Sequence, residues 1–242
     1  MRRHLLLVSM LAFAPHAQAS DFDIDCATAC QAAFEDVVTD ISAALNYKAL
    51  GPAEATGLLG FGVGAFVSYV PVQNEQAWRT LTGSDVDAVA MAGLSAHKGL
   101  PFGIDIGAFY TAVPGTDAKA YGAELRYAIL EGGIAQPALA LRGAYTATSG
   151  IDDFDYDAYS ADVSLSKGFT FVTPYIGAGY VWATATPSGS VTGAPLNLEE
   201  VEVDNERFFV GMRITAVLLE ITPEYERVGD NNAYNLRLGF SF

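Results

Sequence analysis

The chain has 242 residues, with 13 Lys and Arg against 28 Asp and Glu, and a formal net charge of −15. This balance excludes nucleic-acid binding as an expected function, because that activity requires a basic surface. Hydrophobic residues make up 51% of the chain and the mean hydropathy is +0.24, so the chain is not expected to be disordered and needs a large apolar environment.

The first nineteen residues have the pattern of a secretory signal peptide. A basic start at Arg2 and Arg3 precedes the short apolar stretch 5–14, and the small residues 17–19 form a cleavage site. This stretch is too short to cross a membrane as a helix. We therefore predict that residues 1–19 are removed, that the protein is exported, and that the mature chain begins at Ser20.

Residues 20–53 differ from the rest of the chain. Between about residues 25 and 47, apolar residues recur at three- and four-residue steps, which predicts one helical stripe. These residues are Cys30, Phe34, Val37, Ile41 and Leu45. Gly51 and Pro52 end the segment. We expect one helix here, ahead of the domain that follows.

Cys26 and Cys30 are the only cysteines. An exported chain meets an oxidising compartment, which permits a disulfide between them. Residues four apart in a regular helix have Cβ atoms about 5–6 Å apart, whereas a disulfide needs about 3.8 Å. The bridge would therefore require a distorted first helical turn. A metal site would need more ligands than this pair supplies.

From residue 54 onward the apolar residues recur with a period of two, which indicates strands with two distinct faces. Segments of about ten residues with this alternation are typical of transmembrane barrels. Ten strands are predicted, near residues 59–69, 88–96, 102–110, 121–129, 139–145, 159–165, 176–182, 208–214, 219–225 and 234–242. The connections at 71–85, 149–157 and 187–204 are long, and the alternating set near 98–101, 131–136, 167–171 and 217–218 is mostly short.

The last strand ends on an aromatic residue. Its apolar face is unbroken to the final position and consists of Tyr234, Leu236, Leu238, Phe240 and Phe242. The run NAYNLRLGFSF resembles the closing strand of bacterial outer-membrane β-barrels. The resemblance covers residues 54–242 and implies an all-β, antiparallel transmembrane barrel in the outer membrane of a Gram-negative bacterium. It implies as partners the barrel-assembly machinery, outer-membrane lipid and lipopolysaccharide. A soluble β-sandwich or lipocalin-like barrel would explain neither the signal peptide nor the aromatic residue at the end of the last strand.

The face opposite the apolar one carries ten charged residues that we expect in the lumen. They are Asp105, Glu124, Arg126, Arg142, Asp162, Arg207, Arg213, Glu220, Glu224 and Arg237. Charges at membrane depth must pair with one another or contact water. A salt-bridged interior that holds a narrow barrel together is favoured over a selectivity lining for a pore. Small residues on the same face would leave volume for water or for the helix of residues 20–53. We expect this periplasmic or plug helix to dock at the periplasmic mouth of the barrel or to enter its lumen partly.

The predicted extracellular connections are acidic. Asp152, Asp153, Asp155 and Asp157 lie in one of them, and Glu199, Glu200, Glu202, Asp204 and Glu206 lie in another. Oxygen ligands at such spacing suit Ca²⁺ or Mg²⁺, but the first run lacks the glycine and terminal glutamate of an EF-hand loop. A solvated acidic loop is favoured over a metal site. Divalent ions bridging these carboxylates to lipopolysaccharide phosphates are an alternative.

Catalysis has little support in the sequence. His97 is the only histidine outside the signal peptide, and it shares a strand face with Ser95. This pair resembles the Ser and His of barrel lipid hydrolases, but the predicted topology places it at the periplasmic end, away from outer-leaflet substrates. We expect no enzyme and no cofactor.

The favoured function is a structural or narrow porin-like barrel that allows at most slow passive diffusion of small solutes. The alternative is a binding or adhesion barrel whose lumen is plugged by the helix, and a weaker one is a lipid-modifying hydrolase. Barrels of about eight strands are filled by their own side chains, whereas barrels of 16–18 strands leave a channel. A barrel of ten strands is therefore close in size to those that are closed. The sequence leaves open the solute or ligand, the state of the lumen and the oligomeric state.

Overall fold

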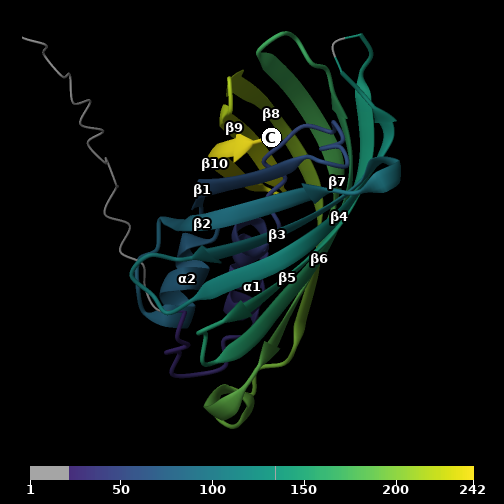
Figure 1. Cartoon of the computed structure of the whole chain (residues 1–242). Coiled ribbons are helices and arrows are strands. Elements are labelled where there is room, and N and C mark those ends of the chain that lie inside the picture. The colour runs from purple at the N-terminus through teal and green to yellow at the C-terminus, as the bar shows by residue number, and fades with distance from the viewer. Residues whose placement is uncertain (1–21, 134) are drawn as a thin grey trace, which may run out of the picture.

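The protein is one closed sheet of ten antiparallel strands (Figure 1). The computed structural model describes residues 22–133 and 135–242. Each strand pairs with its neighbours in sequence, and β1 closes the sheet on β10, with Val67 opposite Leu236. The predicted all-β, antiparallel ten-stranded barrel is confirmed. The predicted signal peptide, residues 1–19, lies outside the described residues.

The strands match the predicted segments but are mostly longer. They are β1 (Phe61–Pro71), β2 (Ala88–Gly99), β3 (Ile104–Ala112), β4 (Lys119–Glu131), β5 (Ala138–Ser149), β6 (Phe154–Ser166), β7 (Val172–Pro187), β8 (Val201–Ala216), β9 (Leu219–Val228) and β10 (Asn231–Ser241). The long connection predicted at 149–157 is wrong, because β6 already begins at Phe154. Phe154 and Tyr156 point inward and are buried, so they belong to the barrel interior rather than to a loop.

The two ends of the barrel differ in their connections. The two longest connections, 72–87 and 188–200, lie at one end, which we call the loop end; they contain α2 (Glu75–Thr82) and η2 (Gly189–Thr192). The opposite end, here the turn end, contains η1 (Pro101–Gly103). The chain terminus is also at the turn end, where the amide of Phe242 donates to the carbonyl of Phe61 at 3.0 Å.

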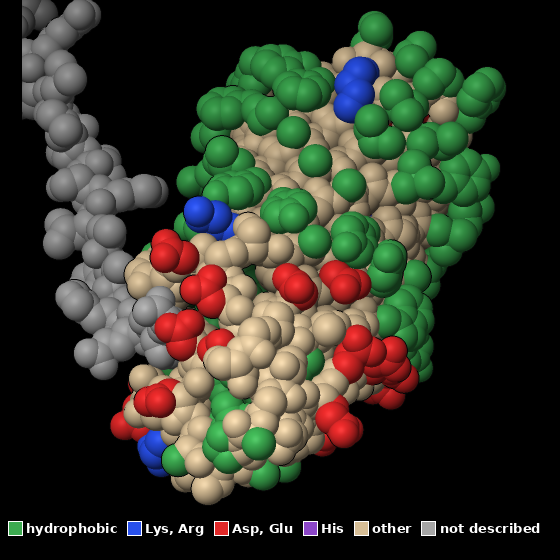
Figure 2. All heavy atoms as spheres, turned by 90° about the horizontal axis from the view of Figure 1, so that it is seen from below, with side chains coloured by type: hydrophobic (Ala, Val, Ile, Leu, Met, Phe, Trp, Pro, Cys, Tyr) green, Lys and Arg blue, Asp and Glu red, His purple; other side chains and the backbone are tan. Residues whose placement is uncertain are grey.

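The outer face of the barrel carries a belt of apolar side chains with a sharp border at the loop end. On β8, Glu202, Asp204 and Glu206 are exposed on the outer face, and the next outward residues are apolar, beginning at Phe208. Aromatic pairs lie along this border, including Tyr145 with Tyr159 at 4.8 Å between ring centroids. Figure 2 shows hydrophobic side chains gathered on the wall and acidic ones along its border with the loop end.

The helix α1 (Gln31–Leu45) lies inside the barrel (Figure 1). It contacts strands on several sides of the lumen, namely β1, β2, β7, β8, β9 and β10. Its apolar stripe is buried, with Phe34 packed edge-on against Phe154 at 5.5 Å. The apolar partner that this stripe needs is thus the inner face of the barrel near the loop end, and not a surface at the turn-end mouth.

The predicted helix span of about 25–47 is too long. The helix begins only after Cys30, whose sulfur is bonded to Cys26, so this pair precedes the first turn and does not distort it. At the other end, the Asn46 side-chain amide donates to the carbonyls of Ser42 and Ala43, at 2.9 and 3.0 Å. These bonds satisfy two of the free carbonyls of the last turn and end the helix before Gly51.

The second helix, α2, covers the lumen at the loop end. Its buried residues Ala77, Trp78 and Leu81 face the barrel, and its C-terminus ends at Gly83, which has a positive φ of 69°. No helix in residues 22–133 or 135–242 has the length and apolar character needed to cross a bilayer.

Candidate functional site

The candidate site is the lumen, which is filled by residues 31–56, here called the plug. The plug passes along the barrel from the loop end to the turn end. Near the loop end, Gln31 contacts the connection between β7 and β8 through the backbone amide of Glu199, at 2.9 Å. Near the turn end, the amide of Thr56 donates to Asp105 at the start of β3, at 3.1 Å. The plug therefore spans the lumen from one end to the other.

A row of alternating charges runs along the inner face of the wall at mid-height, from one strand to the next. The Arg142 guanidinium pairs with Glu124 at 3.4 Å on one side and with Asp162 at 3.2 Å on the other. Asp162 also pairs with Arg207 at 3.3 Å, and Glu124 contacts His97 Nδ1 at 3.1 Å. The side chains of Arg142, Glu124 and Asp162 are at most 1% exposed. Each buried charge in this row thus has an opposite neighbour, as a water-poor interior requires.

The plug completes this row. Arg207 pairs with Glu226 at 2.6 Å, and Glu226 pairs with Lys48 of the plug at 2.8 Å. The Phe209 ring lies beneath two guanidinium groups, 5.6 Å from Arg142 Cζ and 5.1 Å from Arg207 Cζ. Such cation–π contacts are favourable when they are desolvated. Lys48 therefore neutralises a wall carboxylate that would otherwise be buried with one partner fewer.

Wall charges nearer the turn end hold the extended part of the plug. Arg126 is paired with Asp105 at 2.8 Å and donates to the carbonyl of Pro52 at 2.9 Å. Arg213 forms an ion pair with Glu54 at 2.5 Å. Nearer the loop end, the Glu224 carboxylate accepts a hydrogen bond from the backbone amide of Leu50 at 3.0 Å. The extended segment is therefore fixed by backbone and side-chain contacts to the wall.

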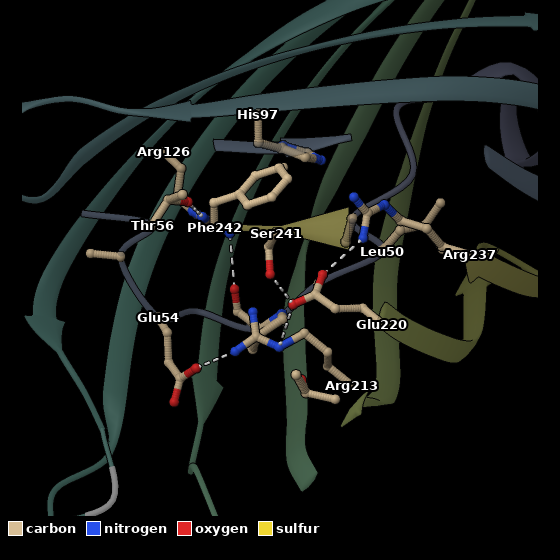
Figure 3. A pocket seen from close by; sticks show the side chains of 16 residues that line it. Leu50, Glu54, Thr56, His97, Arg126, Arg213, Glu220, Arg237, Ser241 and Phe242 are labelled. Carbon is tan, nitrogen blue, oxygen red and sulfur yellow. Dashed lines mark hydrogen bonds and ion pairs between the residues drawn. The ribbon is translucent and has the colours of Figure 1, made fainter. Parts of the chain in front are cut away.

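A cavity of about 300 Å³ opens beside the plug at the turn end (Figure 3). Its lining includes Glu54, Thr56, His97, Arg213, Arg237 and Phe242. Glu220 pairs with both arginines, Arg213 at 3.5 Å and Arg237 at 3.3 Å. The positive charges of the cavity are thus matched by carboxylates, so its charge pattern does not select an anion.

Large side chains of the wall fill the space beside inner-face glycines. A Cβ on Gly177 would lie 2.1 Å from the Phe209 ring, and one on Gly211 would lie 2.5 Å from the Tyr175 ring. A Cβ on Gly64 would lie 2.7 Å from Arg237. The volume left by small residues is therefore taken up at these positions by rings and a guanidinium, and not only by the helix.

The loop end of the lumen is covered by residues 22–30, α2 and the connection 188–200, here together called the cap. Asp40 joins the plug to this cap. Its buried carboxylate accepts from the amides of Gln73 and Asn74, the Asn74 side chain, Trp78 Nε1 at 2.9 Å, and Asn231 at 2.8 Å. These donors come from the connection after β1, from α2 and from the start of β10. A single carboxylate thus holds α1, α2 and the barrel rim together.

Replacing this carboxylate should loosen the cap. In Asp40→Ala the buried donors Trp78 Nε1 and Asn231 Nδ2 lose their acceptor, at about 1–3 kcal/mol for each unsatisfied group. We expect α2 to open more often and trypsin to cut faster after Arg79, which is exposed on α2. Asp36→Ala is the matched control, because Asp36 lies one turn earlier on α1 and is exposed. Equal cleavage rates in both variants would contradict this role.

All ten predicted lumen charges lie on the inner face. Nine are buried, and the Arg213 side chain is 25% exposed at the cavity. Four further charged side chains contribute to the lumen contacts and were not predicted, which are Asp40, Lys48, Glu54 and Glu226. Glu226 has the same strand parity as Glu220 and Glu224, so the period of two could have found it. The three plug residues had no such signal, because their partners lie far away in sequence.

The other candidate residues do not form an assembled site. Asp153 accepts from the amide of Ile24 at 2.7 Å, whereas Asp155 and Asp157 lie on the outer face of β6. Within the described residues, no three His, Cys, Asp or Glu side chains are grouped to hold a metal ion. Ser95 accepts from Arg237 at 3.1 Å and His97 contacts Glu124, so both side chains belong to the charge network.

Comparisons with known proteins add only similarity of fold. No protein-family model matches the sequence, and no curated protein matches it. Among solved structures, the chain is similar to the N-terminal β-barrel domain of OprF of Pseudomonas aeruginosa, with 13% identity, a TM-score of 0.38 and coverage of 77% of this chain and 99% of that one.

Two further outer-membrane proteins give similar values. The attachment invasion locus protein Ail of Yersinia pestis has 14% identity, a TM-score of 0.34 and coverage of 76% and 97%. The KdgM porin has 7% identity, a TM-score of 0.37 and coverage of 74% and 99%. Similarity at this level gives no weight to the functions of these proteins for this chain.

Proposed function

We propose that this protein is a structural outer-membrane barrel whose lumen is closed by its own N-terminal segment, so that solutes pass at most slowly. The observation that carries this proposal is the filled lumen. From Phe34 to Leu50 nearly the whole plug is buried, and Lys48 forms an ion pair with a wall carboxylate. A conducting porin would instead need an open path lined by solvated charges.

The outer surface supports a membrane location. Its exposed side chains between the two barrel ends are largely apolar, as on Leu94, Leu125 and Val210. Water would make so large an apolar surface prone to association, whereas a bilayer accommodates it. The change from acidic to apolar residues between Glu206 and Phe208 would then mark one membrane border.

Fractionation and conductance test this proposal. The protein should be recovered with the outer membrane and should migrate on unboiled gels as a compact form that shifts on heating. Purified protein in a planar bilayer should give few or no channel openings. Recovery in the soluble periplasmic fraction would exclude the barrel's membrane role, and steady, porin-sized conductance of the full-length chain would exclude a closed lumen.

The terminal aromatic residue should matter for assembly more than for packing. Phe242 is 71% exposed, so its ring contributes little to the folded barrel. We expect Phe242→Asp to reduce the amount of heat-modifiable protein in the outer membrane, with a larger effect than a similar change at Ser241. Phe102→Asp is the matched control, because Phe102 is an 87% exposed aromatic at the same end. Equal losses in both variants would argue against recognition of the terminal residue.

A binding barrel is the second candidate, and the ordered loop end favours it. The start of the described chain is held there by the Ile24 amide on Asp153 and by the Asp25 amide on the carbonyl of Leu81, at 2.8 Å. With exposed carboxylates nearby, such a surface would suit a cationic ligand. Cells carrying the protein should then bind fluorescent polylysine more strongly than cells carrying the variant Glu199→Gln with Glu200→Gln, which removes two exposed carboxylates of this surface, and equal binding would reject this candidate.

A further inference from the structure

The first and last described residues, Phe22 and Phe242, lie at opposite ends of the barrel. Ten strands, an even number, bring the start of β1 and the end of β10 to the same mouth, where Phe61 and Phe242 exchange backbone hydrogen bonds at 3.2 and 3.0 Å. The plug crosses the lumen once more before β1 begins. The described chain therefore runs from one end of the barrel to the other an odd number of times. Phe22 consequently lies at the end opposite Phe242.

The contacts that residues 22–31 make with the barrel place Phe22 at the loop end independently of the strand count. The Phe22 ring packs on Trp78 of α2 at 5.8 Å between centroids. The amide of Asp25 donates to the carbonyl of Leu81, and Gln31 is bonded to Glu199. These partners all belong to connections at the loop end. The first described residues are therefore part of the cap and not of the turn-end mouth.

The contacts of the plug with the wall fix its direction within the lumen. In chain order, Lys48 meets Glu226, Pro52 meets Arg126 and Thr56 meets Asp105. Glu226 lies near the loop end of β9, whereas Asp105 lies at the turn-end start of β3. The successive partners thus approach the turn end. Because Gln31, at the start of the plug, is held at the loop end, the plug makes a single pass from the loop end to the turn end.

We infer that the barrel carries its own N-terminal segment through the lumen and presents the start of the mature chain on the cell surface. The inference rests on the proposed outer-membrane location, in which the turn end with Phe242 faces the periplasm and the loop end faces outside. The further activity is thus display: a segment placed ahead of Phe22 would cross the outer membrane with the barrel and stay attached to it through the plug.

Epitope accessibility on living cells tests this inference. One epitope is inserted ahead of Phe22, which precedes the first described contact. A second is inserted between Gly189 and Ser190 at the loop end, and a third between Lys167 and Gly168 at the turn end. Each form is first checked for heat-modifiable migration. Antibody binding is then measured on intact cells and again after permeabilising the outer membrane.

We expect the epitope ahead of Phe22 to give nearly the same signal on intact and permeabilised cells, like the one at Gly189. The epitope at Gly168 should be detected only after permeabilisation. Detection of the Phe22 epitope only after permeabilisation, with the Gly189 epitope already accessible, would overturn the inference and leave the proposed function intact. Protection of both would overturn the inference together with the proposed orientation.

A small label covers the case in which the epitope prevents assembly. Asp21→Cys is combined with Cys26→Ser and Cys30→Ser, so that position 21 carries the only thiol of the mature chain. A membrane-impermeant maleimide should label this variant on intact cells. The same background with Lys167→Cys in place of Asp21→Cys should be labelled only after permeabilisation. Labelling of position 21 only after permeabilisation would again overturn the inference.

Discussion

Deletion of residues 22–56 is expected to convert a closed barrel into one that conducts ions. The deletion removes α1 and with it the Lys48 ammonium and the backbone groups that occupy the lumen. Wall charges such as Glu226 and Arg207 would then contact water and line a path. Because the Phe209 and Tyr175 rings remain, and ten strands lie near the closed end of the size range, we expect small, discrete openings in a planar bilayer.

The same deletion should also lower the unfolding temperature without preventing assembly, because inner apolar residues such as Phe66 and Phe109 lose their cover. Deletion of residues 189–197 is the control, since it trims the cap and keeps the plug. Conductance that is unchanged by removal of residues 22–56 would show that wall side chains alone close the lumen and that the helix is only a tether.

The period of two explains why the strands and the inner face could be predicted. In a strand, successive side chains point to opposite faces, so one apolar outer row assigns the rest inward. Arg142, Asp162 and Arg207 were placed in the lumen on this basis alone, and all three are buried there. The closure of the sheet was instead implied by the resemblance of the last strand to those of outer-membrane barrels, and the even strand number and the alternating connection lengths agree with it.

The pairing of these charges could not be predicted, because it depends on register between strands. Glu124 and Arg126 are two residues apart on one face, so the period of two alone makes them candidate neighbours. In the barrel, Arg126 lies opposite Asp105 on one neighbouring strand and Arg142 on the other. Arg126 therefore forms an ion pair with Asp105, and Glu124 forms one with Arg142. Period alone places a charge on a face and leaves its partner open.

The plug contacts were beyond prediction for a related reason. Asp40 is separated by 191 residues from Asn231, and Lys48 by 178 residues from Glu226. Helical periodicity marks an apolar stripe, but it does not give the surface that the stripe meets. Asp40 and Lys48 lie off that stripe and would be read as solvated. They are buried because the plug is surrounded by wall on several sides.

Arg142→Ala is expected to lower the stability of the barrel far more than Arg227→Ala. Removing the Arg142 guanidinium leaves Glu124 and Asp162 with one partner fewer in a buried setting, and breaking such pairs costs about 3–5 kcal/mol. Arg227 pairs with Asp230 at 3.0 Å, but these side chains are 53% and 92% exposed, and exposed pairs contribute about 0–1 kcal/mol. The difference is measured by unfolding both variants in urea and monitoring the loss of the heat-modifiable form.

A compensating change separates the structural role of Arg142 from a role in ion selectivity. In Arg142→Ala with Glu124→Gln, the carboxylate that lost its partner is neutral, so part of the stability should return. His97 still contacts the amide at position 124, and Asp162 keeps Arg207. If Arg142 instead lined an open pore, the single variant would keep its stability and its reversal potential would shift toward cations. Because the lumen is filled by the plug, we expect the loss of stability and its partial recovery to dominate.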